Sequence, residues 1–486
     1  MPERVIFEKS KAGVRAVALP ACDVPEKPLA EMIPEKYLRK EPAPLPEVSE
    51  VEIARHFTRL SQQNVGVDTH FYPLGSCTMK YNPKINEALA ALPGFLKLHP
   101  YQPEETAQGV LELMWLMQEW LAEIAGMKAV SLQPAAGAHG ELTGILLIRA
   151  YHRDRGDDAR KNMLIPDSAH GTNPASVAIC GFSPVELASD SRGNVDLDDL
   201  RARCDERTAG MMLTIPSTLG LFDEHLPEMV EVLHERGALL YMDGANMNAI
   251  MGRVRPGEAG VDVMHFNLHK TFSTPHGMGG PGSGPVAVGE ALEPYLPTPL
   301  VVRDGDRFFL DHDRPKSVGR VKSFYGNVGV VVKAAVYVLM LGAGGLKRTS
   351  DAAVLNANYL QKRLKEHFWL KYDRPCMHEF VISGARQKKR YGVRTLDIAK
   401  RLLDLGFHPP TIYFPLIVEE ALMVEPTESE TRETLDAFAD ALIRIARECE
   451  EDPESVKAAP QRMPVKRLDE VRAVRQPVLR WRRDGE

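Results

Sequence analysis

The sequence predicts an α/β protein with a mostly parallel β-sheet, followed by a smaller α+β domain. Three observations indicate this class. First, 486 residues are too many for one small core and indicate two or three domains. Second, from about residue 105 short apolar runs alternate with helical patterns, which is typical of βαβ units. Third, the pattern after Val328 becomes rich in helices with only short apolar runs between them.

The chain begins with irregular segments. Pro20–Pro46 holds seven prolines, and proline fixes φ and donates no backbone hydrogen bond, so we expect an extended arm over residues 1–60. The stretch His70–Asn82 is rich in side chains that can line a pocket, although an ordinary surface loop is equally compatible with it.

A large domain is predicted over residues 61–335. An amphipathic helix is expected over residues 105–125 and another over Glu224–Arg236. The predicted strands are Asn162–Asp167, Pro184–Ala188, Met211–Pro216, Ala238–Asp243, Val261–Leu268 and Pro285–Val288. Parallel sheets of this kind carry their functional groups at the carboxyl ends of the strands.

A small α+β domain is predicted over residues 336–460. Its predicted helices are Leu355–His367, Arg394–Leu405 and Thr431–Cys449, with short apolar runs at Thr411–Phe414 and Ala421–Val424. Residues 461–486 form a basic tail, which is either a solvated end or a segment that docks onto a partner.

Composition excludes several classes of protein. The formal net charge of −6 gives no electrostatic reason to expect nucleic acid or an anionic membrane as a partner. The longest apolar runs, such as Val328–Leu341, are interrupted, and we expect none to reach the roughly 20 residues of a membrane span. No signal sequence is evident at the start. The six cysteines form no C-x-x-C motif, so we expect reduced thiols in a cytoplasmic protein.

Functional side chains lie near several predicted element ends. The segment Gln133–Glu141 lies directly before an apolar helix that runs to about Arg153. Small residues at a helix start let backbone N–H groups approach an anion, and the helix dipole favours a phosphate there. Taken alone, this segment is also compatible with an ordinary tight helix entry.

Three further features follow predicted strands. His170 could stack on a planar cofactor, although a single loop histidine is usually structural or solvated. Asp243 is either a helix cap or the partner of a cationic ring nitrogen, and Ala245 is small enough to pack under a ring. Lys270 lies at the end of an apolar strand, where a charge is costly unless it is bonded or neutralised, and a Schiff base resolves that cost.

These features together form the set that pyridoxal phosphate requires. One group holds the phosphate, one stacks on the ring, one keeps the pyridine nitrogen protonated, and one carries the aldehyde. The segment Gly277–Gly282 formally matches G-x-G-x-x-G, but it contains a proline and does not open a helix, so we exclude a dinucleotide site. We expect these glycines to form a loop after the Schiff-base lysine.

At these residues the sequence resembles the glycine decarboxylases, the pyridoxal-phosphate proteins of the glycine cleavage system. More narrowly, it resembles the second, catalytic subunit of their two-subunit form. The segments that carry the resemblance are Tyr72–Lys80, Gln133–Glu141, Ser168–Ser176, Ile215–Asp223, Met242–Asn248, His265–Gly284 and Arg320–Gly329.

The resemblance implies the fold-type-I pyridoxal-phosphate architecture, with a mainly parallel seven-stranded sheet and a small C-terminal domain. It implies that Lys270 is the Schiff-base lysine, Asp243 the partner of the pyridine nitrogen and His170 the stacking ring. The cofactor-lining positions that we predict besides these are Ala136, Gly137, Thr218, Ala245 and His269. No metal site is predicted.

The resemblance also implies partners and a reaction. Single-chain members of the family consist of two related halves, and this chain matches only the lysine-bearing half, so we expect a companion subunit without that lysine in an α2β2 assembly. The implied reaction is decarboxylation of glycine with transfer of the aminomethyl group to the lipoyl arm of the H-protein, an oxidoreductase step of glycine catabolism. A separate aminomethyltransferase acts downstream. Two alternatives remain open: another fold-type-I amino-acid decarboxylase, or a non-catalytic scaffolding subunit.

Overall fold

The computed structural model describes residues 2–41, 43–99, 102–277 and 282–482. Contacts divide the chain into two compact units, one of Met1–Gly66 with Ala459–Glu486 and one of Val67–Ala458. The predicted domain boundaries after residues 60 and 460 lie close to the ends of the larger unit. The predicted boundary at residue 335 falls inside one long helix, α11 (Val328–Leu364).

The smaller unit joins the two ends of the chain. Its elements are η1 (Ile6–Lys9), α1 (Leu29–Met32), η2 (Glu35–Tyr37), α2 (Glu50–Gln62) and α16 (Glu470–Arg475). Ser49 and Glu52 form a capping box that starts α2. The ring of Phe7 stacks on Trp481 with centroids 5.2 Å apart, so the basic tail contacts the N-terminal segment of the same chain.

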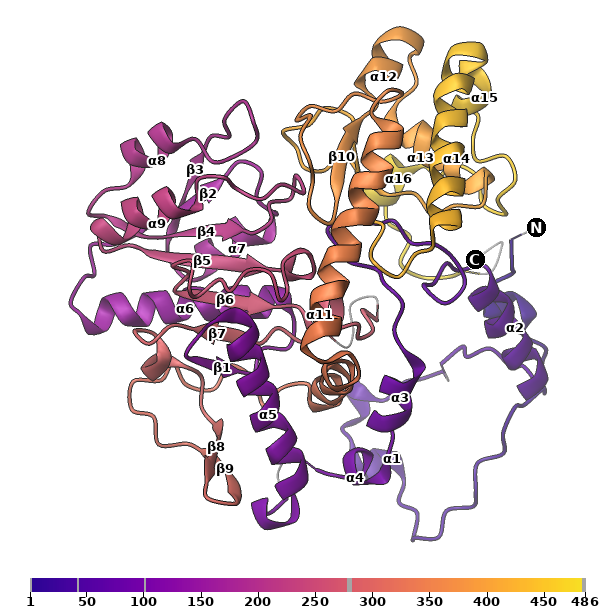
Figure 1. The fold of residues 1–486 in the computed structure, drawn as a ribbon. Helices are drawn as coiled ribbons and strands as arrows, with labels where there is room; N and C mark the ends of the chain where they lie inside the picture. Colours follow the sequence, from indigo (N-terminus) through magenta and orange to yellow (C-terminus); the bar gives the residue numbers. More distant parts are fainter. Residues whose placement is uncertain (1, 42, 100–101, 278–281, 483–486) are drawn as a thin grey trace. The chain divides into compact units, whose positions relative to one another are not determined.

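A seven-stranded sheet forms the centre of the larger unit (Figure 1). Its order is β1-β7-β6-β5-β4-β2-β3. Only β7 runs antiparallel to its neighbours, so the predicted mainly parallel seven-stranded sheet is confirmed. The strands are β1 (Ala129–Ser131), β2 (Asn162–Pro166), β3 (Ser183–Leu187), β4 (Thr208–Thr214), β5 (Leu239–Gly244), β6 (Val263–Phe266) and β7 (Val286–Val288).

Helices cover both faces of this sheet because side chains alternate between the faces along each strand. One core packs the sheet against α5, α8, α9 and α11, and the other packs it against α6 and α7. The remaining elements of this part are short helices and a hairpin. Their bounds are α3 (Lys84–Ala90), α4 (Pro93–Leu96), η3 (Glu104–Thr106), α5 (Gln108–Ala125), α6 (Gly137–Asp154), α7 (Thr172–Ile179), α8 (Leu197–Arg203), α9 (Leu226–Glu235), η4 (Met247–Ala249), α10 (Leu268–Thr271), η5 (Glu293–Tyr295), β8 (Leu300–Asp304) and β9 (Arg307–Asp311).

Helix α11 corrects one expectation from the sequence. By length and composition it is long and apolar enough to cross a membrane, although its apolar run is interrupted by a lysine and by glycines. Its first half packs in the core beneath the sheet and its second half in the core of the C-terminal part, as expected of a core helix. Gly342, at φ +59°, marks the kink between the two halves.

The C-terminal part of the larger unit is the predicted α+β region. A three-stranded antiparallel sheet, in the order β10-β12-β11, packs against the second half of α11 and against α13 and α14. Its elements are β10 (Phe380–Ser383), α12 (Ala385–Tyr391), α13 (Thr395–Asp404), β11 (Thr411–Ile412), β12 (Ala421–Val424), α14 (Arg432–Glu451) and α15 (Pro453–Lys457). All six cysteines are free thiols.

Candidate active site

A cavity of about 270 Å³ lies at the carboxyl edge of the large sheet. All eight residues that the sequence predicts for the cofactor site line it. The complete lining is Ser76, Ala136, Gly137, Ala138, Glu141, His170, Thr172, Thr214, Thr218, Asp243, Ala245, Asn246, Asn267, His269 and Lys270. The site forms here because the carboxyl ends of parallel strands meet at one edge of a sheet.

One wall of the cavity is the start of α6. Ala136 is the N-cap residue, and no side chain caps the helix, so the N–H groups of its first turn are available to an anion. A Cβ atom at Gly137 would overlap the side chain of Asn267, and one at Gly284 would overlap the carbonyl of Ala136. Only glycine therefore allows this close approach. The cradle fits a phosphate group.

Asp243 lies buried at the floor of the cavity, at the end of β5. Its carboxylate accepts hydrogen bonds from the Asn173 amide at 3.1 Å and from the Ala245 N–H at 2.9 Å, and His265 Nε2 lies 3.4 Å away. Burial alone would raise the pKa of Asp243. The charge of His265 and these hydrogen bonds outweigh burial and hold the pKa below its usual value. Asp243 is thus an anion at neutral pH.

Lys270 lies in α10, just after β6. Its Nζ donates a hydrogen bond of 2.7 Å to the carbonyl of Ser76. Ser76 comes from the irregular segment His70–Asn82, so that segment does line the pocket. The backbone of Ser76 is left-handed, at φ +66°, which is a strained conformation for a residue with a side chain.

The remaining predicted residues complete the walls. The exposed ring of His170 meets Phe414 edge-on at 5.5 Å between centroids, and its Nδ1 lies 2.8 Å from the Thr172 hydroxyl. Thr218 is buried, and its hydroxyl donates to the carbonyl of Ser168.

His269 belongs to a pair of histidines beside Lys270. Its ring lies edge-on to His276, with centroids 5.0 Å apart. Burial, together with the nearby His276 and Lys270 charges, lowers the pKa of His269 to about 3. Burial and Lys270 lower the pKa of His276 to about 4. Both rings are therefore neutral at pH 7 and add no positive charge next to the lysine.

Sequence reasoning missed several lining residues, most clearly Ser76, Glu141 and Asn267. Glu141 is buried and accepts hydrogen bonds from Thr172 and Asn173. Its spacing of four residues from Gly137 places it on the same helix face, and that spacing could have revealed it. No local signal identifies Ser76, because its partner Lys270 lies 194 residues away.

The glycine-rich segment Gly277–Gly282 follows the lysine in the chain. Its residues 278–281 lie outside the described part, so the predicted loop there stays a prediction. The Asn327 amide donates to the carbonyl of Gly282, and the N–H of the next residue, Ser283, donates to His269 Nδ1 at 3.3 Å.

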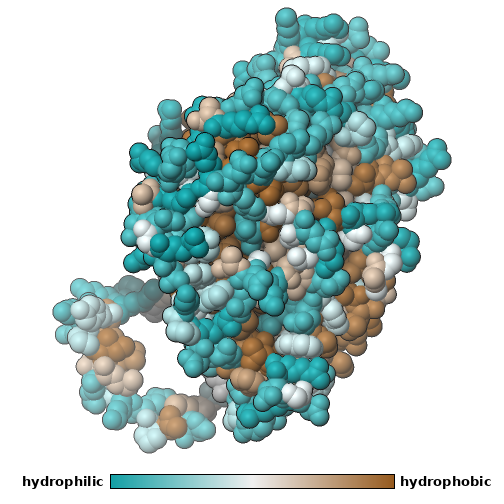
Figure 2. Space-filling model, turned by 60° about the vertical axis from the view of Figure 1, so that its left-hand side comes forward, coloured by the Kyte–Doolittle hydropathy of each residue, from teal (hydrophilic) through white to brown (hydrophobic). Residues whose placement is uncertain are grey.

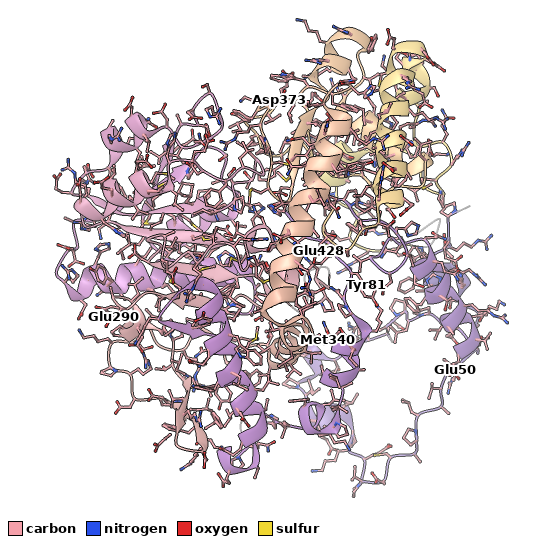
Figure 3. All side chains as sticks on the ribbon, in the orientation of Figure 1. Glu50, Tyr81, Glu290, Met340, Asp373 and Glu428 are labelled. Carbon is pink, nitrogen blue, oxygen red and sulfur yellow. The ribbon has the colours of Figure 1, made fainter. Side chains whose placement is uncertain are left out.

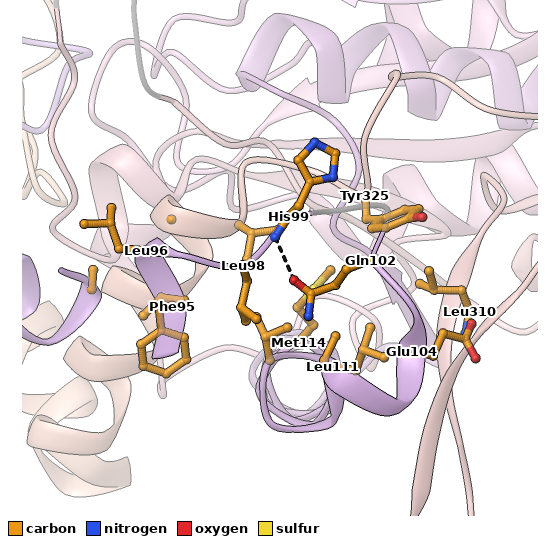
Figure 4. Close-up of a pocket in the computed structure, with 16 residues that line it drawn as sticks. Phe95, Leu96, Leu98, His99, Gln102, Glu104, Leu111, Met114, Leu310 and Tyr325 are labelled. Atoms are coloured by element: carbon orange, nitrogen blue, oxygen red, sulfur yellow. Dashed lines mark hydrogen bonds between the residues drawn. The ribbon is translucent and has the colours of Figure 1, made fainter. Parts of the chain in front are cut away.

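A second cavity, of about 260 Å³, lies away from these residues (Figure 4). Its wall is mostly apolar and comes from the region of α4, α5, β9 and the start of α11, including Phe95, Leu96, Met114 and Leu310. In its one drawn hydrogen bond, the backbone N–H of His99 donates to the side-chain oxygen Oε1 of Gln102 at 3.0 Å. None of the predicted site residues lines it, so it is not the centre of the chemistry.

The fold and the edge site define the class of fold-type-I pyridoxal-phosphate enzymes. Among solved structures, a glycine decarboxylase (P-protein) of the glycine cleavage system, in inhibitor-bound form, superposes with a TM-score of 0.72. That match is 24% identical and covers 86% of this chain and 94% of the other. The sphingosine-1-phosphate lyase of Burkholderia pseudomallei has a TM-score of 0.61 at 15% identity, over 90% of this chain and 94% of that chain.

Comparisons with protein families and with related sequences show which family of this class the chain belongs to. Residues 23–308 match the glycine cleavage system P-protein family, and residues 349–467 match the C-terminal domain of glycine dehydrogenase. A probable glycine dehydrogenase (decarboxylating) subunit 2 of Caldanaerobacter subterraneus is 61% identical, over 98% of each chain. One of the same description from Chlorobaculum tepidum is 58% identical, over 98% of this chain and 99% of the relative. The chain belongs to the family of glycine cleavage system P-proteins, and these two relatives are described as probable second subunits.

Proposed function

We propose that this chain is the catalytic subunit of a glycine decarboxylase that uses pyridoxal phosphate and passes the aminomethyl group of glycine to the lipoyl arm of an H-protein. The observation that carries the proposal is the convergence of Lys270, Asp243 and the uncapped start of α6 on one cavity. Membership of the family indicates glycine as the substrate, and the residues that line the cavity are of the kinds that bind pyridoxal phosphate.

The residues present fit pyridoxal phosphate. The start of α6 would hold the phosphate, Asp243 the protonated ring nitrogen, His170 one face of the ring, and Lys270 the aldehyde carbon. Bound in this way, the cofactor accepts the electron pair that remains on the α-carbon when carbon dioxide departs.

The chain's own residues keep the site in the required charge state. Asp243 is ionised and buried, so it favours a proton on the ring nitrogen opposite it. The Ser76 carbonyl holds the Lys270 amine at 2.7 Å and fixes its direction. The neutral rings of His269 and His276 avoid repulsion of a cationic nitrogen beside them.

The name of the relatives, subunit 2, supports a companion subunit, which we propose to be the lysine-free half in an α2β2 assembly. Exposed apolar side chains on the larger unit are compatible with such a partner. Leu96 is 71% exposed, and Leu339 and Met340, on α11, are 65% and 54% exposed. Figure 2 shows apolar residues, in brown, gathered in patches among polar ones on the face that it presents.

The test is glycine-dependent exchange of labelled bicarbonate into the glycine carboxyl group. We expect exchange when this chain, the companion subunit, pyridoxal phosphate and lipoylated H-protein are all present, and no exchange with Lys270→Ala in place of the wild-type chain. Release of methylamine without the carrier protein would favour a decarboxylase that reprotonates its product. Full exchange by the Lys270→Ala complex would favour a scaffolding role.

A further inference from the structure

A cluster of three buried ionisable side chains lies in the C-terminal part of the larger unit, outside the cofactor cavity. His378 and Glu379 directly precede β10, and Glu425 directly follows β12. Because Phe380 pairs with Val424 in the antiparallel ladder, Glu379 and Glu425 fall opposite each other at the next position. His378, Glu379 and Glu425 each have an exposed fraction of 0%.

The three side chains converge without bonding one another. His378 Nε2 lies 3.8 Å from Glu379 Oε1 and 3.9 Å from Glu425 Oε1, distances too long for hydrogen bonds. One ligand-type atom from each residue lies within 4.8 Å of the others. Neither ring nitrogen of His378 has a hydrogen-bond partner, and Glu379 Oε1 has none either. Buried polar atoms without partners are rare and costly, so they call for an occupant.

The carboxylates of Glu379 and Glu425 accept hydrogen bonds from two residues of the segment His70–Asn82. The N–H of Ser76 donates to Glu379 Oε2 at 2.6 Å. The N–H of Thr78 donates to Glu425 Oε2 at 2.8 Å, and its hydroxyl donates to Oε1 at 2.5 Å. Both loop residues have left-handed backbones, at φ +66° and +46°. Metal-binding carboxylates are typically oriented by hydrogen bonds of this kind.

The two carboxylates also favour a cation at this point. Glu379 and Glu425 lie side by side in a dry interior, where two like charges are costly unless a proton or a cation lies between them. The positive charge of Lys270 acts on the cluster as well, but its amine donates to the Ser76 carbonyl.

The geometry distinguishes these two occupants. A proton shared by Glu379 and Glu425 would pair one carboxyl with the other and leave both nitrogens of His378 unpartnered. A single cation would satisfy His378 Nε2, Glu379 Oε1 and Glu425 Oε1 at once. Two ligands separated by 3.8–3.9 Å subtend an angle of about 110–140° at an ion ~2.1–2.3 Å from each, which suits a site of low coordination number.

We propose that His378, Glu379 and Glu425 form a binding site for one divalent first-row cation, Zn²⁺ or Mn²⁺. One imidazole and two carboxylates are a donor set that suits these ions. The two negative charges balance the charge of the ion.

The proposed metal site would be connected to the cofactor cavity through the backbone of Ser76. The Ser76 carbonyl accepts from Lys270, and the Ser76 N–H donates to Glu379. An ion that fixes Glu379 and Glu425 would therefore fix the loop that holds Lys270, and would tie β10 and β12 to that loop. None of the three ligands lines the cofactor cavity, so this proposal stands or falls independently of the proposed reaction.

The experiment measures metal binding by the purified full chain after dialysis against EDTA. Calorimetric titration with ZnCl₂ and with MnCl₂, and elemental analysis after gel filtration, should give one tight ion per chain for at least one metal. Glu379→Gln and Glu425→Gln should each weaken that binding at least tenfold. Thr78→Val, which keeps shape but removes one outer hydrogen bond, should weaken it about tenfold.

Glu420→Gln is the matched control. Glu420 is also a buried carboxylate of this part, but it pairs with Lys388 and accepts from the Thr395 N–H, so its variant should bind metal as the wild type does. The melting temperature of wild type and control should rise with added metal, and that of the two glutamine variants should not. No binding by the wild type, or equal binding by Glu379→Gln and Glu425→Gln, would overturn the proposal. A metal-independent gain in stability in those variants would assign the cluster to a shared proton instead.

Discussion

Replacing Asp243 by asparagine tests the electrostatic part of the site. The carboxylate receives hydrogen bonds from two donors, the Asn173 amide and the Ala245 N–H, and has His265 at 3.4 Å. An asparagine keeps the shape but has a single acceptor oxygen and no charge. Removal of one preorganised electrostatic group costs about 10²–10³-fold in turnover, so we expect Asp243→Asn to lose exchange by this factor at saturating pyridoxal phosphate. The new side-chain NH₂ group would also face one of the two buried donors, the Asn173 amide or the Ala245 N–H. A buried donor left without an acceptor costs about 1–3 kcal/mol in the free energy of unfolding.

The assays are bicarbonate exchange and urea unfolding, with Asp223→Asn as the control. Asp223 is also buried and accepts hydrogen bonds from the Val195 and His225 N–H groups, but it does not line the cavity. Its variant should lose comparable stability and keep its turnover per folded chain. Near-normal exchange by Asp243→Asn would show that Asp243 only caps the loop after β5 and has no electrostatic role in the reaction.

Three further predictions concern the same site. His170→Ala should weaken retention of pyridoxal phosphate during gel filtration while Lys270 still reacts with it, and unchanged retention would exclude stacking. His276 has a folded-state pKa of about 4, below its usual value of 6.5, so its contribution to stability is lost as the pH falls from about 6.5 to about 4. His276→Asn should therefore reduce the pH slope of the unfolding free energy by about 1.4 kcal/mol per pH unit in that window, measured by urea unfolding of the cofactor-free chain. Finally, the chain assayed without its companion subunit should show no exchange, and full activity of the lone chain would refute the shared assembly.

Most of the large sheet is predictable because most of its strands are apolar, buried runs, although β3 (Ser-Pro-Val-Glu-Leu) is mixed and largely exposed. The structure has a strand at each of the six predicted positions. Strand β1 (Ala129–Ser131) was not predicted, because it has only three residues and forms through its pairing with β7, which lies far along the chain. The helix predicted from Leu355 is the second half of α11, which begins at Val328. The prediction began too late because Gly342 interrupts the apolar pattern, whereas in the structure this glycine only kinks the helix.

The site was predictable where a residue follows a strand in the chain. Lys270 and Asp243 are of this kind, since local sequence places them at the sheet edge. The contribution of Ser76 was not predictable, because Ser76 meets Lys270 across 194 residues of chain. Lys80, in the same segment, likewise donates from Nζ to Asn248, Tyr337 and Glu428, which come from distant parts of the chain. Figure 3 shows Glu428 and the neighbouring Tyr81 close to α11, the helix that carries Tyr337. Such contacts depend on tertiary packing, and no pattern along the chain encodes them.

Borohydride reduction of the complex with pyridoxal phosphate, followed by peptide mapping, shows directly which lysine carries the cofactor. We expect the cofactor aldehyde at Lys270, because this is the lysine among the cavity-lining residues and its amine is held by the Ser76 carbonyl. We therefore expect one pyridoxyl group per chain, on the peptide that contains Lys270, and none after reduction of the Lys270→Ala complex. A pyridoxyl group on another lysine, or none on this chain when the complex is active, would contradict the assignment of Lys270 as the Schiff-base lysine.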